Sequence, residues 1–368
     1  MNLTSAARIA RTSLLLADGL LLALFLTGAA AAYFDPAVYW FGAMIAVTLP
    51  LLGIFLLPLA ILLWRIRRRF LALVQVALVL AMGSRHISLE RFAQRAPSPS
   101  DLVLMTLNAP RRPDSKKLGA ELAQLVGELE PDMIALQESK IYTDNRDPER
   151  LRAWPKFEPL LDSLDYSMLL PREDLPGKHW REWSQPLLAR FEIEQQDQLS
   201  FRSAKPDWPE LHVLRTEFRW QQRKIAHYNV HLASFGPTKP WIEGAGWLDL
   251  DTWLTHTVEV RRAYRIRSWQ VEQVRELIDH ERHPVILSGD FNSTPDSWVY
   301  HRLSQGLQDA YRVAGSGWGA TYHSNAPTLR IDFVLLGPEF EAVSAQVRSL
   351  STRFSDHRPL TARFRWRQ

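Results

Sequence analysis

The sequence predicts an α+β domain of packed mixed sheets with helices outside, preceded by N-terminal transmembrane helices. The opening 85 residues consist mainly of long apolar stretches. After residue 100, many short apolar runs of strand length alternate with turn residues, and only a few stretches have helical periodicity. We therefore expect a membrane anchor over 1–85, a linker over 86–100 and a folded domain over 101–368.

The anchor contains apolar stretches at 14–34 and 39–64, and each has the ~20 residues that cross a bilayer. A third stretch, 70–84, is short for a full span and could instead be interfacial or re-entrant. The first stretch could also be a cleaved signal peptide, because Arg8 and Arg11 precede it and small residues end it. The second stretch would hold the protein in the membrane in either case. Two or three transmembrane helices are therefore expected.

Positive charge is concentrated in this anchor. Residues 1–85 hold seven Lys or Arg and two acidic residues. The remaining chain therefore has a net charge near −1, although the net charge of the whole protein is +4. This balance disfavours a nucleic-acid partner, which would require the positive excess on the folded domain. Arginines precede the first apolar stretch and gather at 65–69 after the second, and the positive-inside rule places both groups in the cytoplasm. If 70–84 crosses, the folded domain lies outside the cytoplasm. We expect this arrangement, in a multi-pass protein of the cell inner or plasma membrane.

The elements of the folded domain follow a polar linker that contains Pro97 and Pro99. A helix is expected at 114–130, because Asp114 is a candidate N-cap and apolar residues then recur at helical spacing. A second helix is expected from Arg261 to about Glu281. Short apolar runs predict strands at 101–109, 131–139, 184–193, 211–220, 224–234, 284–292, 330–337, 342–350 and 357–366.

A tryptophan-rich segment, 235–269, separates two of these strands. Trp241, Trp247 and Trp253 recur every sixth residue, a spacing that does not return to one helical face. The segment is therefore either a packed loop with buried tryptophans or a lid or interfacial anchor near lipid, since Trp favours the headgroup region.

Polar residues recur where the predicted strands begin or end. Asp290 and Asn292 follow the run 284–287 and share one face of an extended segment, while Phe291 points into the packing. Each such residue alone could be a turn or a cap. Together they indicate a site, and the full set is Asn108, Glu138, His231, Asp290, Asn292, Asp332, Asp356 and His357.

These side chains are hard oxygen ligands together with possible acid–base groups. Such a set suits Mg²⁺ or Mn²⁺. The chain has no cysteine, which excludes disulfides, thiolate nucleophiles and cysteine-based zinc sites. It also has no Gly-rich phosphate loop and no GxSxG elbow, so kinase and serine-hydrolase chemistry are disfavoured.

The order TLNAP, IALQES, NVHLAS, GDFNSTP, RIDFVLL and SDHRPL over 101–368 resembles the endonuclease/exonuclease/phosphatase superfamily, which includes DNase I-like proteins. GDFN and SDHRPL are its specific motifs; the membrane segments are outside the resemblance. The resemblance implies a four-layered α/β/β/α sandwich with the active site at one rim. A tyrosine that some nuclease members place before the middle strands cannot be located.

The resemblance also implies a role for each polar residue. Glu138 would be the principal metal ligand, with Asn108 and Asp356 close to the metal or its waters. Asp290 would orient or deprotonate the attacking water, and Asn292 would hold a phosphate oxygen. His357, oriented by Asp332, would contact the scissile phosphate, and His231 would assist the leaving group.

Three functions are compatible with these observations. The first is a membrane-anchored, metal-dependent phosphodiesterase or phosphatase that acts on a lipid-derived or other small phosphoester. The second is a nuclease, which the family allows and the charge disfavours. The third is a non-catalytic recognition module, which is disfavoured because all eight of the polar residues named above are present. The expected partners are the lipid bilayer and a phosphoester substrate; the oligomeric state is not predicted.

Overall fold

The computed structural model of the protein describes residues 3–88, 96–109, 115–139, 141–144, 147–152, 160, 164–168, 180–183, 185–235, 250–325, 328–350 and 354–367. The chain forms two compact units, each made of several chain segments. Unit 1 comprises 1–87, 235–268 and 293–301, and unit 2 comprises 88–234, 269–292 and 302–368.

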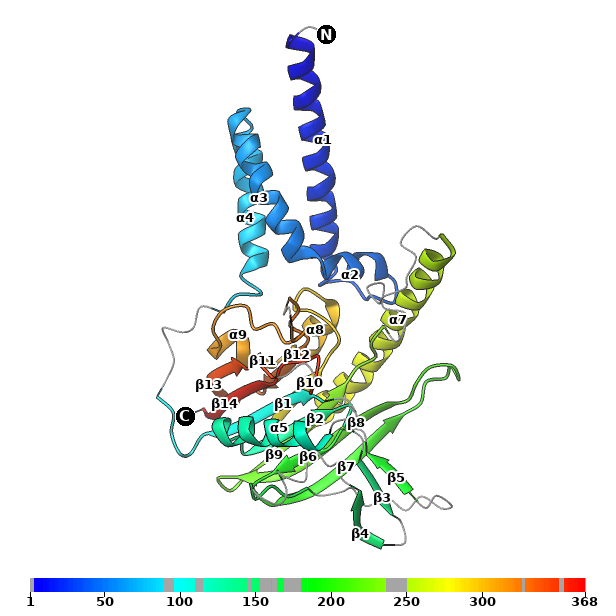
Figure 1. Ribbon diagram of the computed structural model, residues 1–368, viewed down its shortest axis with the longest axis vertical. Helices are drawn as coiled ribbons and strands as arrows, with labels where there is room; N and C mark the ends of the chain where they lie inside the picture. Colours follow the sequence, from blue (N-terminus) through cyan, green and yellow to red (C-terminus); the bar gives the residue numbers. More distant parts are fainter. Residues whose placement is uncertain are drawn as a thin grey trace. The chain divides into compact units, whose positions relative to one another are not determined.

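Unit 1 contains the apolar N-terminal helices α1 (Leu3–Ala30), α2 (Trp40–Ala46), α3 (Leu49–Arg65) and α4 (Arg69–Gly83). A side chain at Gly28, near the end of α1, would contact Leu49 at the start of α3. Further along α3, the Leu56 carbonyl accepts a hydrogen bond (3.3 Å) from Gln75 of α4, whose amide also donates to Asp18 of α1 (2.9 Å). The helices α1, α3 and α4 therefore run alternately up and down beside one another (Figure 1).

Among the described helices, one stretch, Arg8–Ala30, is by itself long and apolar enough to span a membrane. The stretch 39–64, expected as one span, is divided into α2 and α3, whose axes differ by 67°. The break coincides with Pro50, which lies in the first turn of α3 and has no N–H to continue a preceding helix. The helix α4 has 15 residues and matches the third apolar stretch.

Unit 2 contains two mixed sheets, in agreement with the predicted α+β class. The first has the strand order β13-β14-β1-β2-β6, and the second β11-β12-β10-β9-β8-β7; β4-β3-β5 is a separate small sheet. The strands of the first sheet are β1 (Leu102–Asn108), β2 (Met133–Gln137), β6 (Leu187–Ala189), β13 (Phe340–Val347) and β14 (Leu360–Trp366). Those of the second are β7 (Ile193–Phe201), β8 (Leu211–Trp220), β9 (Arg223–His231), β10 (Val285–Asp290), β11 (Gln308–Asp309) and β12 (Asp332–Leu336). The small sheet comprises β3 (Ile141–Asp144), β4 (Asp147–Arg152) and β5 (Trp180–Trp183).

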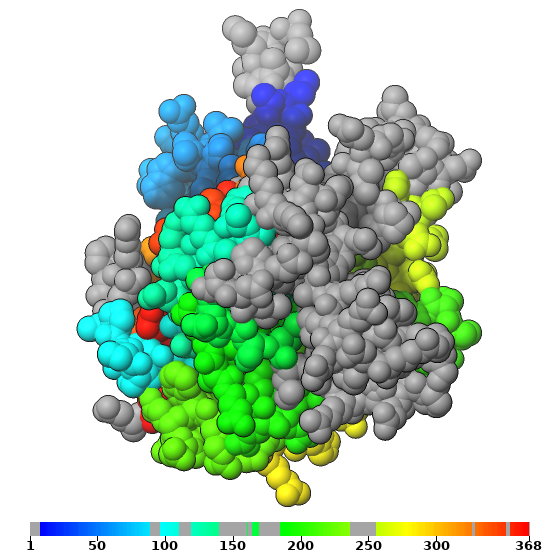
Figure 2. Space-filling view, turned by 60° about the horizontal axis from the view of Figure 1, so that its bottom comes forward, coloured from blue at the N-terminus to red at the C-terminus, as the bar shows by residue number. Residues whose placement is uncertain are grey.

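The main core of unit 2 lies between the two large sheets. Leu104 of β1 belongs to the same buried cluster as Ile286 of β10 and Val334 of β12. On the outer face of the first sheet, Leu122 and Val126 of α5 (Ser115–Leu129) pack against Leu107 and other strand residues. The apolar spacing of α5 provides this face, as predicted. Figure 2 shows α5 (blue-green) and the strands β7 to β9 (green) on one side of the unit.

The C-terminal part of α7 (Leu250–His280) completes the layers, because its residues 273–280 lie beside β7, β8 and β9. This arrangement is consistent with the predicted α/β/β/α sandwich. Two short helices, α8 (Trp298–Leu303) and α9 (Ala310–Ala314), connect strands of the second sheet. The helix α7 begins eleven residues before the predicted start at Arg261. Trp253 lies within it, whereas Trp241 and Trp247 fall outside the described residues.

Candidate active site

The sheet register brings three of the predicted residues to one level of the second sheet. The central strand β10 pairs with β9 in parallel and with β12 antiparallel. In this register Asp290 is the partner of His231 on one side and of Asp332 on the other. The buried Phe291 stacks on Phe333 at 4.9 Å between ring centroids, so it points into the core as predicted.

Gly289 allows β9 and β10 to approach closely next to the site. Its φ is +137°, and a Cβ at this position would lie 1.9 Å from the Val230 carbonyl oxygen. No other residue type fits such a position without moving one of the strands. The glycine of the GDFN motif is therefore a structural requirement for the placement of Asp290.

Asn108 joins the two sheets at the site. It ends β1 of the first sheet, and its Nδ2 donates to Glu138 Oε1 (3.1 Å) and to Asp290 Oδ2 of the second sheet (3.0 Å). His231 faces the same two carboxylates, with Nε2 3.6 Å from Glu138 Oε1 and 3.7 Å from Asp290 Oδ2. Asn108 is buried and Glu138 is 44% exposed, so this cluster is open to solvent on the Glu138 side.

His357 and Asp332 form a buried pair next to Asp290. His357 Nδ1 lies 2.9 Å from Asp332 Oδ2, and its Nε2 lies 3.7 Å from Asp290 Oδ2. Burial opposes protonation of the imidazole, but the charges of Asp332 and Asp290 and the hydrogen bond to Asp332 together raise the pKa of His357 to about 10. His357 is therefore an imidazolium at neutral pH, and both of its nitrogens carry hydrogen.

Asn292 and Asp356 complete the predicted set. The Asn292 backbone N–H donates to Asp290 Oδ1 (2.8 Å), and its side-chain Nδ2 donates to the Leu232 carbonyl (2.9 Å) and to Asp290 Oδ2 (3.3 Å). Asn292 therefore orients Asp290 in this structure, and its amide would have to exchange one of these partners to bind a phosphate oxygen. Asp356 is half-buried before His357, and its charge contributes to the raised pKa of that histidine.

The donor set fits a hard divalent cation. Asn108 Oδ1 is buried, and it has no hydrogen-bond partner among the described residues. This oxygen belongs to the same amide that bridges the Glu138 and Asp290 carboxylates. The amide nitrogen of Asn108 faces the two carboxylates, and its Oδ1 together with the carboxylate oxygens supplies ligand atoms of the kind that Mg²⁺ or Mn²⁺ prefers. A second arrangement is also present, because ligand atoms of Asp290, Asp332 and His357 lie within 4.8 Å of one another. A cation held by this second group would have to displace the proton that Asp332 and Asp290 keep on His357.

Several residues that support the site were not among those predicted. Ser355 Oγ donates to the Asn108 carbonyl (2.6 Å) and accepts from the His357 N–H (2.9 Å), so it fixes the His357 loop to the end of β1. Between the sheets, Gln137 Nε2 donates to Asn229 Oδ1 (2.7 Å). Gln137 stands within the motif IALQES and Ser355 within SDHRPL, and this membership is the signal in the sequence that could have identified them.

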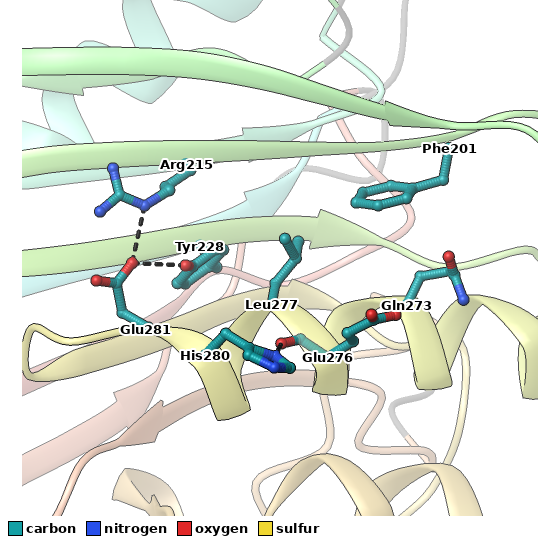
Figure 3. Close-up of a pocket in the computed structure, with 8 residues that line it drawn as sticks. All are labelled: Phe201, Arg215, Tyr228, Gln273, Glu276, Leu277, His280 and Glu281. Carbon is teal, nitrogen blue, oxygen red and sulfur yellow. Dashed lines mark hydrogen bonds and ion pairs between the residues drawn. The ribbon is translucent and has the colours of Figure 1, made fainter.

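A groove of about 430 Å³ lies elsewhere in unit 2, between β7 to β9 and α7 (Figure 3). Two of its charged groups are paired with each other: Arg215 Nε donates to Glu281 Oε2 (2.8 Å), which also accepts from the Tyr228 hydroxyl (2.7 Å). Burial opposes ionisation of Glu281, but these two hydrogen bonds lower its pKa to about 2. None of the predicted site residues lines this groove.

Comparison with known proteins agrees with this fold. Residues 105–357 match the model of the Endonuclease/Exonuclease/phosphatase family. A family member from Leptotrichia buccalis has 18% identity and a TM-score of 0.50, over 72% of this chain and 100% of its own. A mannosyl-6-phosphatase from Bacteroides thetaiotaomicron has 18% identity and a TM-score of 0.47, over 72% and 100% of the two chains. Humanized D. rerio TDP2 has 16% identity and a TM-score of 0.49, over 72% and 99%. No curated protein sequence matches the chain. Because the family model covers more than half of the sequence and includes every predicted site residue, the chain belongs to the Endonuclease/Exonuclease/phosphatase family.

Proposed function

We propose that the protein is a membrane-anchored, divalent-metal-dependent phosphoesterase, which hydrolyses a lipid-derived or small-molecule phosphodiester or phosphomonoester by attack of water. The observation that carries the proposal is the position of Asp290. Its Oδ2 accepts from the Asn108 amide at 3.0 Å and lies 3.7 Å from Nε2 of both His231 and His357. A carboxylate held between two imidazoles can orient a water molecule and accept its proton.

The two histidines near Asp290 would both act on the substrate, His357 on the phosphoryl group and His231 on the leaving group. His357 Nδ1 is engaged by Asp332, so its Nε2–H is directed away from Asp332 and can donate to a phosphoryl oxygen. Because Asp332 and Asp290 hold His357 in the charged form, this donor is available throughout the neutral pH range. His231 is partly exposed and would protonate the leaving oxygen.

Glu138 and the side-chain oxygen Oδ1 of Asn108 would hold the cation, with Asp356 close to its bound waters. When bound, Mg²⁺ or Mn²⁺ supplies positive charge that stabilises the phosphoryl oxygens of the transition state. The residues of the chain itself position the water, accept its proton and donate to the phosphate. Phosphoryl transfer needs such positioning and charge stabilisation and little covalent chemistry from the protein.

The membrane part of the proposal rests on α1, α3 and α4. The hydrogen bond between Gln75 and Asp18 joins α4 to α1, and a Cβ at Gly53 of α3 would meet Phe25 of α1 and Val79 of α4, so the three helices pack side by side. This supports three crossings, with Arg8 and Arg11 near the start of α1 and the arginines of 65–69 around the α3–α4 connection on the cytoplasmic side, and the catalytic domain outside. Reporter fusions after Arg69 and after Pro99 test the topology: opposite compartments agree with it, and a cytoplasmic signal from both contradicts it.

A substrate panel tests the proposed activity. The purified full-length protein in detergent with Mg²⁺ should hydrolyse p-nitrophenyl phosphate, bis(p-nitrophenyl) phosphate or a phospholipid headgroup ester. It should bind duplex DNA weakly, because the soluble domain has no excess of positive charge. Cleavage of DNA together with tight, strongly salt-dependent binding would instead identify a nuclease. Hydrolysis of no phosphoester at all would favour a non-catalytic module.

A further inference from the structure

Asp296 is a fully buried carboxyl group for which the proposed reaction has no use. It lies four residues after Asn292, in the sequence STPDSW that continues the GDFN motif. Its Oδ2 lies 2.5 Å from Nε2 of His86, and its Oδ1 lies 3.7 Å from Nη1 of Arg85. A buried carboxylate that loses its partner is strongly destabilising, so the conformation of this segment depends on the contact.

Both partners of Asp296 lie at the boundary between the anchor and the linker. Arg85 and His86 directly follow α4, and His86 is 210 positions before Asp296 in the chain. Arg85 Nη2 also donates to the Tyr33 hydroxyl at 3.3 Å, and the Tyr33 ring stacks against His301 at 6.2 Å. Within unit 1, the segment 293–301 is therefore attached to residues that follow α1 and to residues that follow α4.

The same segment has a second attachment at its start. Ser293 Oγ accepts a hydrogen bond from Arg267 Nη1 at 3.1 Å, and the buried Arg267 guanidinium lies over the rings of Phe235 (4.9 Å) and Tyr264 (5.3 Å). Tyr264 and Phe235 pack in one apolar cluster with residues of α1, α2 and α3, including Phe25, Ala43 and Leu49. The anchor helices therefore support Arg267 and, through it, Ser293.

These attachments reach the proposed catalytic residues through the chain itself. Ser293 follows Asn292, and Phe235 is four residues after His231. Asn292 has a φ of +48°, in the left-handed region that asparagine adopts more readily than other non-glycine residues. In this conformation its backbone N–H donates to Asp290 Oδ1. A change in the path of 293–296 would therefore disturb Asn292 and the orientation of the Asp290 carboxylate.

We infer that the contact of His86, assisted by Arg85, with Asp296 fixes the conformation of 293–296 and, through the peptide bond between Asn292 and Ser293, the orientation of Asn292 and Asp290. His86 and Asp296 are positioning residues in this inference, which rests on the proposed function. Loss of this contact would then lower turnover.

The test uses the full-length protein in detergent, with bis(p-nitrophenyl) phosphate and Mg²⁺ as assay. The variants are His86→Ala, Asp296→Asn, their double variant and His86→Gln, which keeps an N–H donor for Asp296. The control is Glu210→Gln, which removes the exposed ion pair of Glu210 with Arg202 at the end of the β7–β8 hairpin. Hydrogen exchange of the backbone amides of 293–300 is measured on each protein.

His86→Ala and Asp296→Asn should each lower kcat about tenfold with KM changed less than about twofold, because orientation of Asp290 is lost and substrate binding is not. The double variant should match the single variants, since both remove the same contact. Amide exchange at 293–300 should increase in these variants, whereas His86→Gln should restore most of the turnover. Glu210→Gln should leave kcat and exchange unchanged. If His86→Ala does not fold, Arg85→Gln serves in its place, because it removes the more exposed partner of Asp296. Arg85→Gln should lower kcat by less than about tenfold.

Wild-type kcat together with wild-type amide exchange in His86→Ala would overturn the inference and leave the proposed function intact. A fall in kcat without faster exchange at 293–300 would also overturn it. If the wild-type protein hydrolyses no phosphoester, the proposed function fails separately. The exchange measurement then still decides whether His86 holds the segment.

Discussion

His357 Nδ1 and Asp332 Oδ2 lie 2.9 Å apart and connect the two large sheets of the domain. Asp332 begins β12 of the second sheet, whereas His357 comes shortly before β14 of the first. Both side chains are buried, so the hydrogen bond is shielded from competing water. Asp332 orients the His357 imidazole and helps to keep this ring charged. Both effects depend on this one contact.

This contact predicts that Asp332→Asn and His357→Gln are not additive. Each single variant should lower kcat/KM by about 10²–10⁴, because the charged donor to the phosphate is lost or misoriented. The double variant should lose little more than the worse single variant. Steady-state kinetics with bis(p-nitrophenyl) phosphate measures kcat/KM of the wild type, the two single variants and the double variant. If the losses in kcat/KM of the single variants multiply in the double variant, the two residues act independently.

Glu138 and Asp290 should differ in what they contribute. Glu138→Gln should weaken Mn²⁺ binding at least about tenfold, because a charged oxygen ligand becomes neutral. Asp290→Asn should leave Mn²⁺ affinity within about tenfold of wild type and lower turnover by about 10² or more. Titration calorimetry measures the affinity independently of activity. Loss of Mn²⁺ binding in Asp290→Asn, with binding retained in Glu138→Gln, would move the metal to the group formed by Asp290, Asp332 and His357.

The close approach at Gly289 predicts a large loss of stability. In Gly289→Ala the new Cβ would collide with the Val230 carbonyl oxygen, so the free energy of unfolding should fall by about 3 kcal/mol or more. Gly127→Ala is the matched control, because it lies on the exposed side of α5 with nothing within 4 Å of the new Cβ. The control should be neutral or stabilising by up to about 1 kcal/mol. Denaturant unfolding of the two variants checks this, and equal stabilities would contradict the packing described here.

The sequence predicts most of this fold because its signals are local. The strand pattern and the polar residues at strand ends anticipate β1, β2, β9, β10 and β12, and the structure brings Asn108, Glu138, His231 and Asp290 together as expected. The edge strand β7 was not predicted as a separate element, because its sequence IEQQDQLSF is mostly polar and has no buried face of its own. The partners of Asp296 also could not be predicted, because His86 is far away in the chain and no short-range pattern connects them.

His227 should make stability depend on pH. Burial lowers its pKa to about 3, and its Nε2 lies 2.8 Å from Ser288 Oγ. Between pH 6.5 and about 3 the unfolded chain binds a proton that the folded protein does not, so the free energy of unfolding falls as pH decreases through this window. From pH 7.5 to pH 5 this group should contribute a loss of about 2 kcal/mol.

The variant His227→Asn should remove that contribution to the slope. His212→Asn is its control, because His212 is partly exposed near the start of β8. Urea unfolding of the three proteins at both pH values makes the comparison. A wild-type slope in His227→Asn would show that the proton is taken up elsewhere.

The most direct test of metal-assisted hydrolysis by this site is turnover of bis(p-nitrophenyl) phosphate by the full-length protein before and after chelation. The wild-type protein should lose turnover in EDTA and recover it with excess Mg²⁺ or Mn²⁺, whereas Asp290→Asn, folded and metal-loaded, should stay inactive. Undiminished hydrolysis in EDTA, or near-wild-type turnover by Asp290→Asn, would contradict the assigned chemistry.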